Sequence, residues 1–377
     1  MSIPWKEASS LIIAAKCNDA PTSGTRTTAD YKILLTRRSG KSSYLANTYC
    51  FPGGHIDIAD FGSPWWRIFN SCGFSRGELR KTFLKSDGVP RPPILVGPKI
   101  LESESKAKDF LWPEIALRIA AIRETFEETG ILIARGSRES QINSTPSYES
   151  LSAQVDLKDW QQRVHVDASV FHELLAELDL CPDVWCLKEW WNWLTPPTVG
   201  HKRFDTVFYV ACLDQKPKVN SDQNEVSQIT WLSPKQLLAD HLRGKSFLAP
   251  PQVYELARLG NFDSISDLAS FAADREPLGI ERWCANVTGL ADGALLALPR
   301  DECFNLTIDS SQLPTLEQMR RNVMNRMELR APVFRPVCKN VTFPCGHVAP
   351  INLDPATMSL DGEDGADYSS ARIVSNL

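Results

Sequence analysis

RETFEETGI, residues 123–131, is the stretch of this sequence that decides the fold. Gly130 stands where the C-terminal cap of a helix is expected, because glycine adopts the left-handed backbone conformation without steric cost. Upstream of it, apolar residues recur at helical spacing: Ile115, Ile119, Ile122 and Phe126. The pattern predicts a helix of about four turns that starts near Glu114 and ends at Gly130.

Three glutamates of this helix, Glu124, Glu127 and Glu128, fall on one face. Relative to Glu124, the side chain of Glu127 is rotated by about 60° in one direction and that of Glu128 by about 40° in the other. Such a face is either a solvated acidic surface or a site whose carboxylates hold a cation. Oxygen ligands of this kind favour Mg²⁺ or Mn²⁺. Arg123 is spaced to pair with Glu127 and fix its rotamer, which favours the second interpretation.

Length, charge and cysteine content bound the class of protein. The chain has 377 residues, with 41 Lys and Arg against 46 Asp and Glu, so its formal net charge is −5. The length allows two domains or one elaborated domain. Slight acidity argues against duplex nucleic acid as a partner and favours small molecules. No apolar run approaches the roughly 18 residues of a membrane span. Ten cysteines without a secretory leader indicate a reduced intracellular compartment.

Short apolar runs on both sides of the acidic helix predict a mixed α/β fold. The two runs nearest the N-terminus are expected to be neighbouring strands, and two further strands are expected after the helix. The predicted strands are Leu11–Ala15, Tyr31–Thr36, Thr206–Leu213 and Ile229–Leu232. Helical patterns are found in 151–180, 234–241, 253–259 and 268–273.

Phe51-Pro52-Gly53-Gly54 is either a plain hairpin turn or a turn whose backbone approaches a ligand. With the glutamate helix, it resembles the signature of the Nudix hydrolases: Gly, five residues, Glu, seven residues, then Arg-Glu-apolar-x-Glu-Glu-x-Gly-apolar. Between Gly54 and Arg123 there are 68 residues, 55 more than the signature has, so an insertion splits the motif. Asp60 takes the place of the first signature Glu, and Thr125 the place of an apolar residue.

A second motif narrows the resemblance. Leu34–Ser39 followed by Phe51–Gly54 is similar to the motif of coenzyme A diphosphatases within the Nudix family, except that Ser43 replaces an Arg and Asn47 replaces a Gly. The split motif, together with the run from Trp193 to Thr206, looks like the insert-bearing peroxisomal and mitochondrial acyl-CoA diphosphatase branch.

The resemblance implies an α/β/α Nudix sandwich. Its domain would cover residues 10–245, with residues 61–113 as a helical insertion within the motif. A C-terminal extension, residues 246–349, is expected to be partly helical. Residues 350–377 are rich in Asp, Gly and Ser and are expected to form a mobile tail.

The implied activity is metal-dependent hydrolysis of the diphosphate linkage of coenzyme A or acyl-CoA, which yields 3′,5′-ADP and (acyl-)4′-phosphopantetheine. Two alternatives remain open. One is a diphosphatase for another nucleoside diphosphate derivative, which the departures at Ser43 and Asn47 favour. The other is a catalytically silent Nudix-fold binding module, against which the presence of all three helix carboxylates argues.

The resemblance also implies roles for particular residues. Glu124, Glu127 and Glu128 would hold Mg²⁺ or Mn²⁺, and Arg123 would orient Glu127. Glu225, in a loop before a predicted strand, is a general base, an added metal ligand or a solvated loop acid.

A second set of residues is expected to contact the substrate. Glycine backbone would approach the diphosphate, basic side chains would bind phosphates, and an aromatic ring would stack on adenine. An ordinary solvated surface is the alternative for the basic members. The set comprises Arg37, Arg38, Ser39, Gly53, Gly54, Lys202, Arg203 and Phe204. Four tryptophans either line an acyl or pantetheine groove or belong to the core: Trp185, Trp190, Trp191 and Trp193.

The last three residues, Ser375-Asn376-Leu377, bear on localisation. A terminal Ser-Lys-Leu is a peroxisomal address, and here Asn replaces the Lys. Together with the resemblance, this ending predicts a peroxisomal protein with an import receptor as partner. Mitochondrion and cytosol are the alternatives, although the first twenty residues lack the Arg-rich amphipathic character of a transit peptide.

Overall fold

The structure is a computed structural model that describes residues 4–17, 29–40, 45–102, 109–137, 151, 153–199, 202–220, 226–309, 311–332, 334–338, 341–342 and 346–353. Ser43, Glu225 and the tail from 354 to 377 lie outside the described residues. The roles expected of Ser43, Glu225 and the terminal Ser-Asn-Leu therefore stay predictions.

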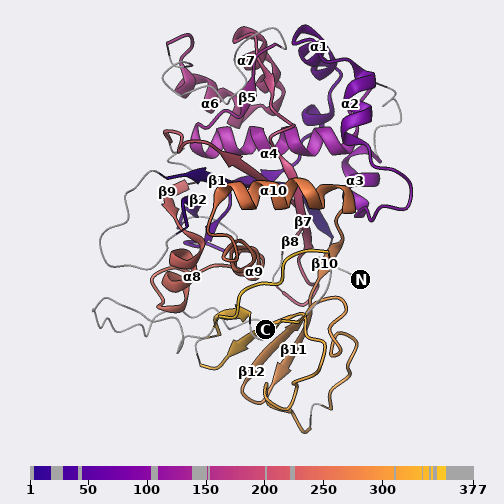
Figure 1. Ribbon diagram of the computed structural model, residues 1–377, viewed down its shortest axis with the longest axis vertical. Coiled ribbons are helices and arrows are strands. Elements are labelled where there is room, and N and C mark those ends of the chain that lie inside the picture. The colour runs from indigo at the N-terminus through magenta and orange to yellow at the C-terminus, as the bar shows by residue number, and fades with distance from the viewer. Residues whose placement is uncertain are drawn as a thin grey trace.

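A mixed eight-stranded sheet forms the centre of the fold (Figure 1). Six strands lie in the order β10-β7-β8-β1-β2-β3, while β4 pairs with β1 and β9 pairs with β2. The strands are β1 (Trp5–Lys16), β2 (Tyr31–Arg38), β3 (Tyr49–Cys50), β4 (Gly53–His55), β7 (Lys188–Leu194), β8 (Arg203–Leu213), β9 (Val226–Leu232) and β10 (Arg282–Cys284).

All four strand predictions are confirmed as β1, β2, β8 and β9. β1 and β2 pair antiparallel, as expected of neighbours. β1 also runs parallel to β8 along nearly its whole length. The side chains of Leu11–Ala15 are 0% exposed, because both faces of the sheet are covered, which explains why this strand reads as an unbroken apolar run.

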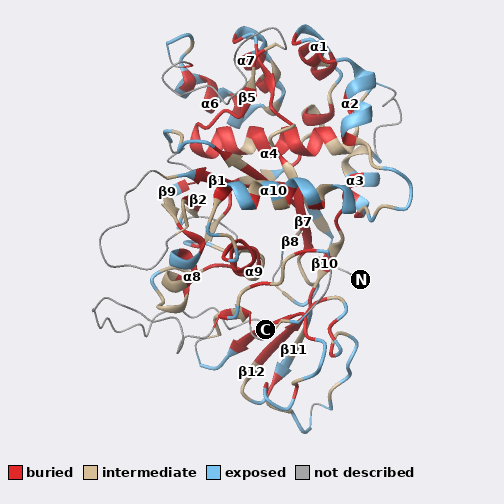
Figure 2. Ribbon diagram, viewed as in Figure 1, coloured by how far each residue is buried: buried red, intermediate tan, exposed pale blue. Residues whose placement is uncertain are grey.

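The glutamate-bearing helix is α4 (Pro113–Thr129), and it agrees with the prediction at both ends. Pro113 occupies the first helical position, where no intrahelical donor is needed, and Gly130 caps the C-terminus with φ 70°. The helix lies across the sheet and is buried along most of its length (Figure 2). Ser9 Oγ on β1 donates to the carbonyl of Leu117 over 2.7 Å and so ties helix to sheet. None of the described helices is long and apolar enough to cross a bilayer.

The insertion between the two halves of the motif is helical, as predicted, and it closes on itself. The backbone N–H of Leu111 donates to the carbonyl of Phe61 over 2.9 Å, so its two ends lie side by side. A long excursion of the chain therefore does not separate Gly54 from Arg123. The short helix η1 (Ile58–Phe61), which contains Asp60, leads into the insertion. The elements of the insertion are α1 (Pro64–Ser71), α2 (Arg76–Phe83), α3 (Pro93–Val96) and η2 (Lys99–Leu101).

The helical pieces expected between 151 and 180 are α6 (Leu157–Val166), η3 (Ala168–Val170) and α7 (Phe171–Glu177). Asp156 caps α6 by accepting from the backbone N–H groups of Lys158 and Asp159. Flanking this segment, β5 (Ala134–Arg135) pairs with β6 (Cys181–Pro182). Both helices lie on the same side of the sheet as α4 and the insertion (Figure 1).

Three of the four tryptophans belong to the core. Trp190, Trp191 and Trp193 lie on β7 and are at most 5% exposed. The indole N–H groups of Trp190 and Trp193 both donate to the carboxylate of Glu255 over 2.7 Å. The core interpretation therefore holds for these three residues, while Trp185 packs on Phe74 of the insertion, with ring centroids 4.3 Å apart.

The remaining helices lie on the opposite side of the sheet from α4, and the extension mixes helix with sheet. α8 (Pro234–Leu242), α9 (Pro250–Leu259) and α10 (Ile265–Arg275) are followed by η4 (Glu276–Leu278). Beyond β10, the chain forms a four-stranded antiparallel sheet that the sequence analysis does not predict (Figure 1). Its strands are β11 (Asn286–Leu290), β12 (Gly293–Ala297), β13 (Arg326–Arg330) and β14 (Pro336–Cys338).

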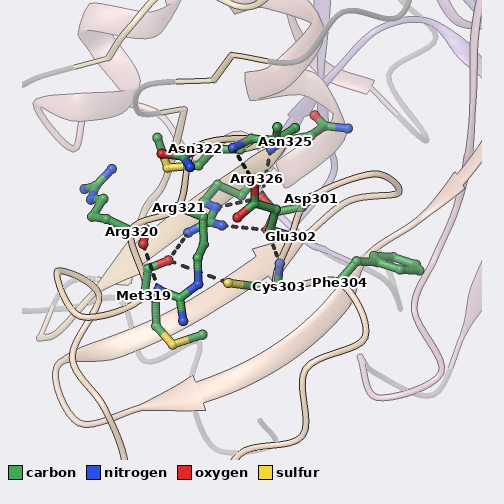
Figure 3. Close-up of polar contacts among 12 residues, drawn as sticks. Asp301, Glu302, Cys303, Phe304, Met319, Arg320, Arg321, Asn322, Asn325 and Arg326 are labelled. Carbon is green, nitrogen blue, oxygen red and sulfur yellow. Dashed lines mark hydrogen bonds and ion pairs between the residues drawn. The ribbon is translucent and has the colours of Figure 1, made fainter.

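Buried charges explain why strand β13 of this second sheet escapes prediction. β13 reads Arg-Met-Glu-Leu-Arg, and the side chains of Arg326 and Glu328 are as buried as that of Met327 between them. Arg326 forms two hydrogen bonds to Asp301, of 2.7 and 2.6 Å (Figure 3). Glu328 pairs with Arg320 at 2.8 Å. A five-residue strand whose buried side chains include charged residues lacks the alternation of apolar and polar residues by which a strand is recognised in a sequence.

Candidate active site

The glycine turn lies directly against the glutamate helix. β4 pairs with β1 so that Gly54 lies opposite Ser9, whose hydroxyl also donates to the carbonyl of Leu117 in α4. A Cβ atom on Gly54 would lie 2.2 Å from Glu124 Oε2, so only glycine leaves room for this carboxylate. A Cβ atom on Gly53, where φ is 145°, would lie 2.4 Å from the carbonyl oxygen of Ser9. A plain hairpin turn would not need glycine at position 54, whereas the contact with Glu124 does.

Arg123 is the centre of a buried ion-pair network. Its guanidinium forms two hydrogen bonds with Asp60, of 2.8 and 3.0 Å. Nη1 reaches Glu124 at 3.0 Å and Glu127 at 2.5 Å, and Nη2 donates to the carbonyl of His55 at 2.9 Å. Burial alone would lower the pKa of Arg123, but Asp60 and the glutamates raise it well above its ordinary value. The insertion therefore does not carry Asp60 away from the site.

Glu128 faces the glycine turn. Its Oε2 atom lies 3.4 Å from the backbone nitrogen of Gly53 and 3.4 Å from the hydroxyl of Thr36, both of which donate to it. The residue is 8% exposed. Glu128 thus connects the helix to the turn and to β2.

The carboxylates of this network are crowded. Burial raises the pKa of Glu124 to about 8; Arg123 opposes this rise, while Glu127 and Asp60 add to it. A divalent cation would relieve such crowding, and the hard oxygen donors present fit Mg²⁺ or Mn²⁺. Within the described part of the chain, no three potential metal ligands converge on one point. The donor set fits a divalent ion, although Glu124 and Glu127 are turned toward Arg123.

Helix α6 supplies two site residues that the sequence analysis missed. Gln161 donates from Nε2 to the backbone carbonyl of Glu127 over 2.8 Å. One turn later, His165 Nδ1 lies 3.5 Å from Glu127 Oε2. Their i, i+4 spacing is the signal that places both on one face of a helix, but nothing local shows that this face meets α4.

The expected phosphate-binding residues are only partly gathered. The pKa of His55 is lowered mainly by burial and further by the charges of Lys6, Arg38, Arg123 and Lys202. Of these cations, Arg38, at the end of β2, and Lys202 are expected phosphate-binding residues. Cationic side chains therefore lower the pKa of His55, which ends β4 next to the glycine turn. Neither Lys6 nor His55 belongs to a recognisable motif, so the sequence alone does not single them out.

The other residues expected to contact the substrate do not all lie near His55. The ring of Phe204 lies 5.5 Å from that of His55. Arg203 is 5% exposed and donates from Nε to the carbonyl of Thr195 over 2.8 Å, so its guanidinium supports the β7–β8 connection. Arg37 and Ser39 are half-buried at the end of β2, the former with its guanidinium 5.9 Å from the ring centroid of Tyr49.

One departure from the coenzyme A motif is conformationally mild. Asn47, which replaces a motif glycine, has φ 61°. Asparagine tolerates this left-handed conformation better than most residues with a side chain. The replacement therefore preserves a turn for which glycine would otherwise be preferred.

Replacing Gly54 by Ala should displace the Glu124 carboxylate and leave the fold intact. The new methyl group would meet the end of a flexible side chain, and the backbone conformation of Gly54 suits alanine. We expect affinity for Mn²⁺ to fall by roughly tenfold or more, since a ligand is displaced. Titration calorimetry measures this affinity, and a urea unfolding curve checks the fold.

Gly77→Ala is the matched control. Gly77 is an exposed residue of helix α2, and the nearest atom to its added Cβ would be 4.0 Å away. That variant should bind Mn²⁺ as the unmodified chain does. Equal Mn²⁺ affinity in the Gly54→Ala protein would show that Glu124 is not a metal ligand.

Comparisons with known proteins agree with this geometry. The family model described as the NUDT19 Nudix domain matches residues 5–259. The chain is 35% identical over 314 residues to "Acyl-coenzyme A diphosphatase NUDT19" of Xenopus laevis, covering 80% of this chain and 81% of the relative. The protein of the same name from Gallus gallus is 36% identical over 314 residues, covering 80% of both chains.

A solved Nudix hydrolase from Alicyclobacillus acidocaldarius is 18% identical, with a TM-score of 0.48, and the match covers 71% of this chain and 96% of that one. The family model extends over more than half of this chain and includes the glycine turn, the insertion and the glutamate helix. The chain therefore belongs to the NUDT19 Nudix domain family of hydrolases.

Proposed function

We propose that this protein hydrolyses the diphosphate linkage of coenzyme A or acyl-CoA, with Mg²⁺ or Mn²⁺ as cofactor. The products would be 3′,5′-ADP and (acyl-)4′-phosphopantetheine. The observation that carries the proposal is the contact of Glu124 and Glu128 with Gly54 and Gly53, which sets hard oxygen donors against the backbone of the glycine turn. Relatives that are 35% and 36% identical carry the name acyl-coenzyme A diphosphatase, which supports the choice of substrate.

Each part of the site has a chemical task in this reaction. Glu124, Glu127 and Glu128 would hold the ion, and Arg123 keeps Glu127 in place through its 2.5 Å contact. When bound, a divalent ion would polarise the phosphoryl oxygens and acidify the attacking water. Glu225 is proposed as general base or added ligand.

The cationic side chains that act on His55 suit the substrate's phosphates. Arg38, Lys202 and Lys6 all lower the pKa of His55, and their charges would attract the diphosphate and the 3′-phosphate of coenzyme A. Phe204 offers a ring on which adenine can stack. Arg203 is assigned no phosphate contact, because it is buried against Thr195.

Competition among three nucleotides tests the substrate. With coenzyme A, NADH and ADP-ribose at equal concentration and Mg²⁺ present, we expect 3′,5′-ADP to be the main product in chromatography. Faster cleavage of NADH or ADP-ribose would instead assign the protein to another nucleoside diphosphate derivative. Binding of coenzyme A without cleavage under any metal would favour the silent binding module.

A further inference from the structure

The carboxylate of Glu127 is held from two sides by residues of different origin. On one side, Arg123 belongs to the same helix and contacts Oε1 at 2.5 Å. On the other side, His165 of α6 lies with Nδ1 3.5 Å from Oε2. The imidazole lies within ion-pair distance of the carboxylate, and its side chain is 33% exposed. One carboxylate is thereby oriented by an arginine within the Nudix motif and a histidine outside it.

Helix α6 also provides a hydrogen-bond donor for the backbone carbonyl of Glu127. The last four carbonyl groups of a helix have no partner within it, and Glu127 lies two residues before the end of α4. Gln161 donates to its carbonyl oxygen over 2.8 Å and is 5% exposed. Since Gln161 and His165 are four residues apart, one face of α6 contacts both the backbone and the side chain of Glu127.

Gln161 extends this contact to the chain segment at Asn220. Its amide exchanges two hydrogen bonds of 3.1 Å with Asn220, one with the backbone carbonyl and one with the side-chain amide. The backbone N–H of Asn220 in turn donates to the carbonyl of Thr129 over 2.7 Å. Gly130 is required here as well, because an added Cβ would lie 3.2 Å from Asn220. α6 therefore joins the C-terminal end of α4 to a second segment of the chain.

We propose that the Gln161–His165 face of α6 is a positioning element that holds Glu127 in place and sets the affinity of the site for its divalent ion. The inference rests on the proposed function, because Glu127 is assigned there as a metal ligand. It predicts that a single exposed side chain, remote in sequence from the Nudix motif, controls metal binding. Hydrogen-bond partners behind a metal ligand typically change metal affinity by about 10- to 100-fold when removed.

Binding of Mn²⁺ to the full chain, measured by titration calorimetry, tests the proposal. His165→Leu removes the donor, whereas the amide of His165→Asn keeps a donor near the position of Nδ1. Gln162→Leu is the control, since Gln162 is an exposed residue of the same helix. We expect His165→Leu to weaken Mn²⁺ binding by about tenfold and to lower kcat without changing KM for coenzyme A. His165→Asn and Gln162→Leu should remain close to the unmodified chain.

Two results would overturn the proposal. One is Mn²⁺ affinity in His165→Leu equal to that of the unmodified chain. The other is an equal loss of affinity in His165→Asn and His165→Leu, which would show that the polar contact at the position of Nδ1 does not hold Glu127. If His165→Leu alone weakens Mn²⁺ binding but no variant or parent cleaves coenzyme A, the positioning role stands and the proposed substrate is wrong.

Discussion

Glu128→Gln is expected to lower kcat for coenzyme A cleavage by roughly 10²- to 10⁴-fold, because a divalent ion contributes several kcal/mol and each 1.4 kcal/mol is tenfold in rate. Glutamine has the size of glutamate, and its carbonyl oxygen can still accept from Gly53 and Thr36. The variant therefore keeps the shape of the site and loses one negative charge. Release of 3′,5′-ADP at saturating Mg²⁺ is the measurement.

The matched control for this substitution is Glu177→Gln, an exposed glutamate on α7. It should leave kcat unchanged, and both variants should unfold in urea near the midpoint of the parent chain. A loss of less than about tenfold in the Glu128→Gln protein would remove Glu128 from the metal site.

Arg123→Met is expected to lower the free energy of unfolding by about 3–5 kcal/mol, the usual effect of breaking a buried ion pair from one side. Asp60, Glu124 and Glu127 would lose the guanidinium that now lies 2.5 to 3.0 Å from their oxygens. Methionine fills much of the same volume, so the loss would come from charge and hydrogen bonding and not from a cavity. Urea unfolding followed by tryptophan fluorescence measures the change.

An exposed ion pair provides the control for Arg123. Lys235 lies 3.0 Å from Asp263, with side-chain exposures of 48% and 60%. Pairs of this kind contribute about 0–1 kcal/mol, so Lys235→Met should change stability little. If Arg123→Met were as stable as Lys235→Met, the Asp60–Arg123 contact would not be a structural support of the site.

The network around Arg123 also shows why a split motif can work. Asp60 precedes the insertion and Arg123 follows it, yet the two are joined by a pair of hydrogen bonds. The insertion can be long because its ends meet at Phe61 and Leu111, and the entropic cost of closing a loop grows only slowly with its length. The length of the insertion therefore matters less for the geometry of the site than the closeness of its two ends.

Local patterns were enough to predict the glutamate-bearing helix α4 and its neighbours. α4 follows from its helical spacing and from Gly130, and Leu11–Ala15 follows from an apolar run typical of a doubly covered strand. The common face of Glu124, Glu127 and Glu128 follows from helix geometry alone. Such features depend on residues a few positions apart, so periodicity and capping suffice to find them.

Other features depend on contacts that no helical or strand periodicity records. Arg203 carries the charge expected of a phosphate contact, but burial against Thr195 directs it elsewhere. The buried charges of strand β13, Arg326 and Glu328, pair with Asp301 and Arg320, which lie outside the strand.

By itself, the sequence determined that three carboxylates share one helical face after a glycine turn, because helix geometry repeats every 3.6 residues. The tertiary structure alone decided that Glu124 packs on Gly54, that Asp60 holds Arg123, and that His165 reaches Glu127. These contacts join residues from 38 to 70 positions apart. No local pattern records which distant side chains become neighbours, since that depends on how the packed elements bring their surfaces together.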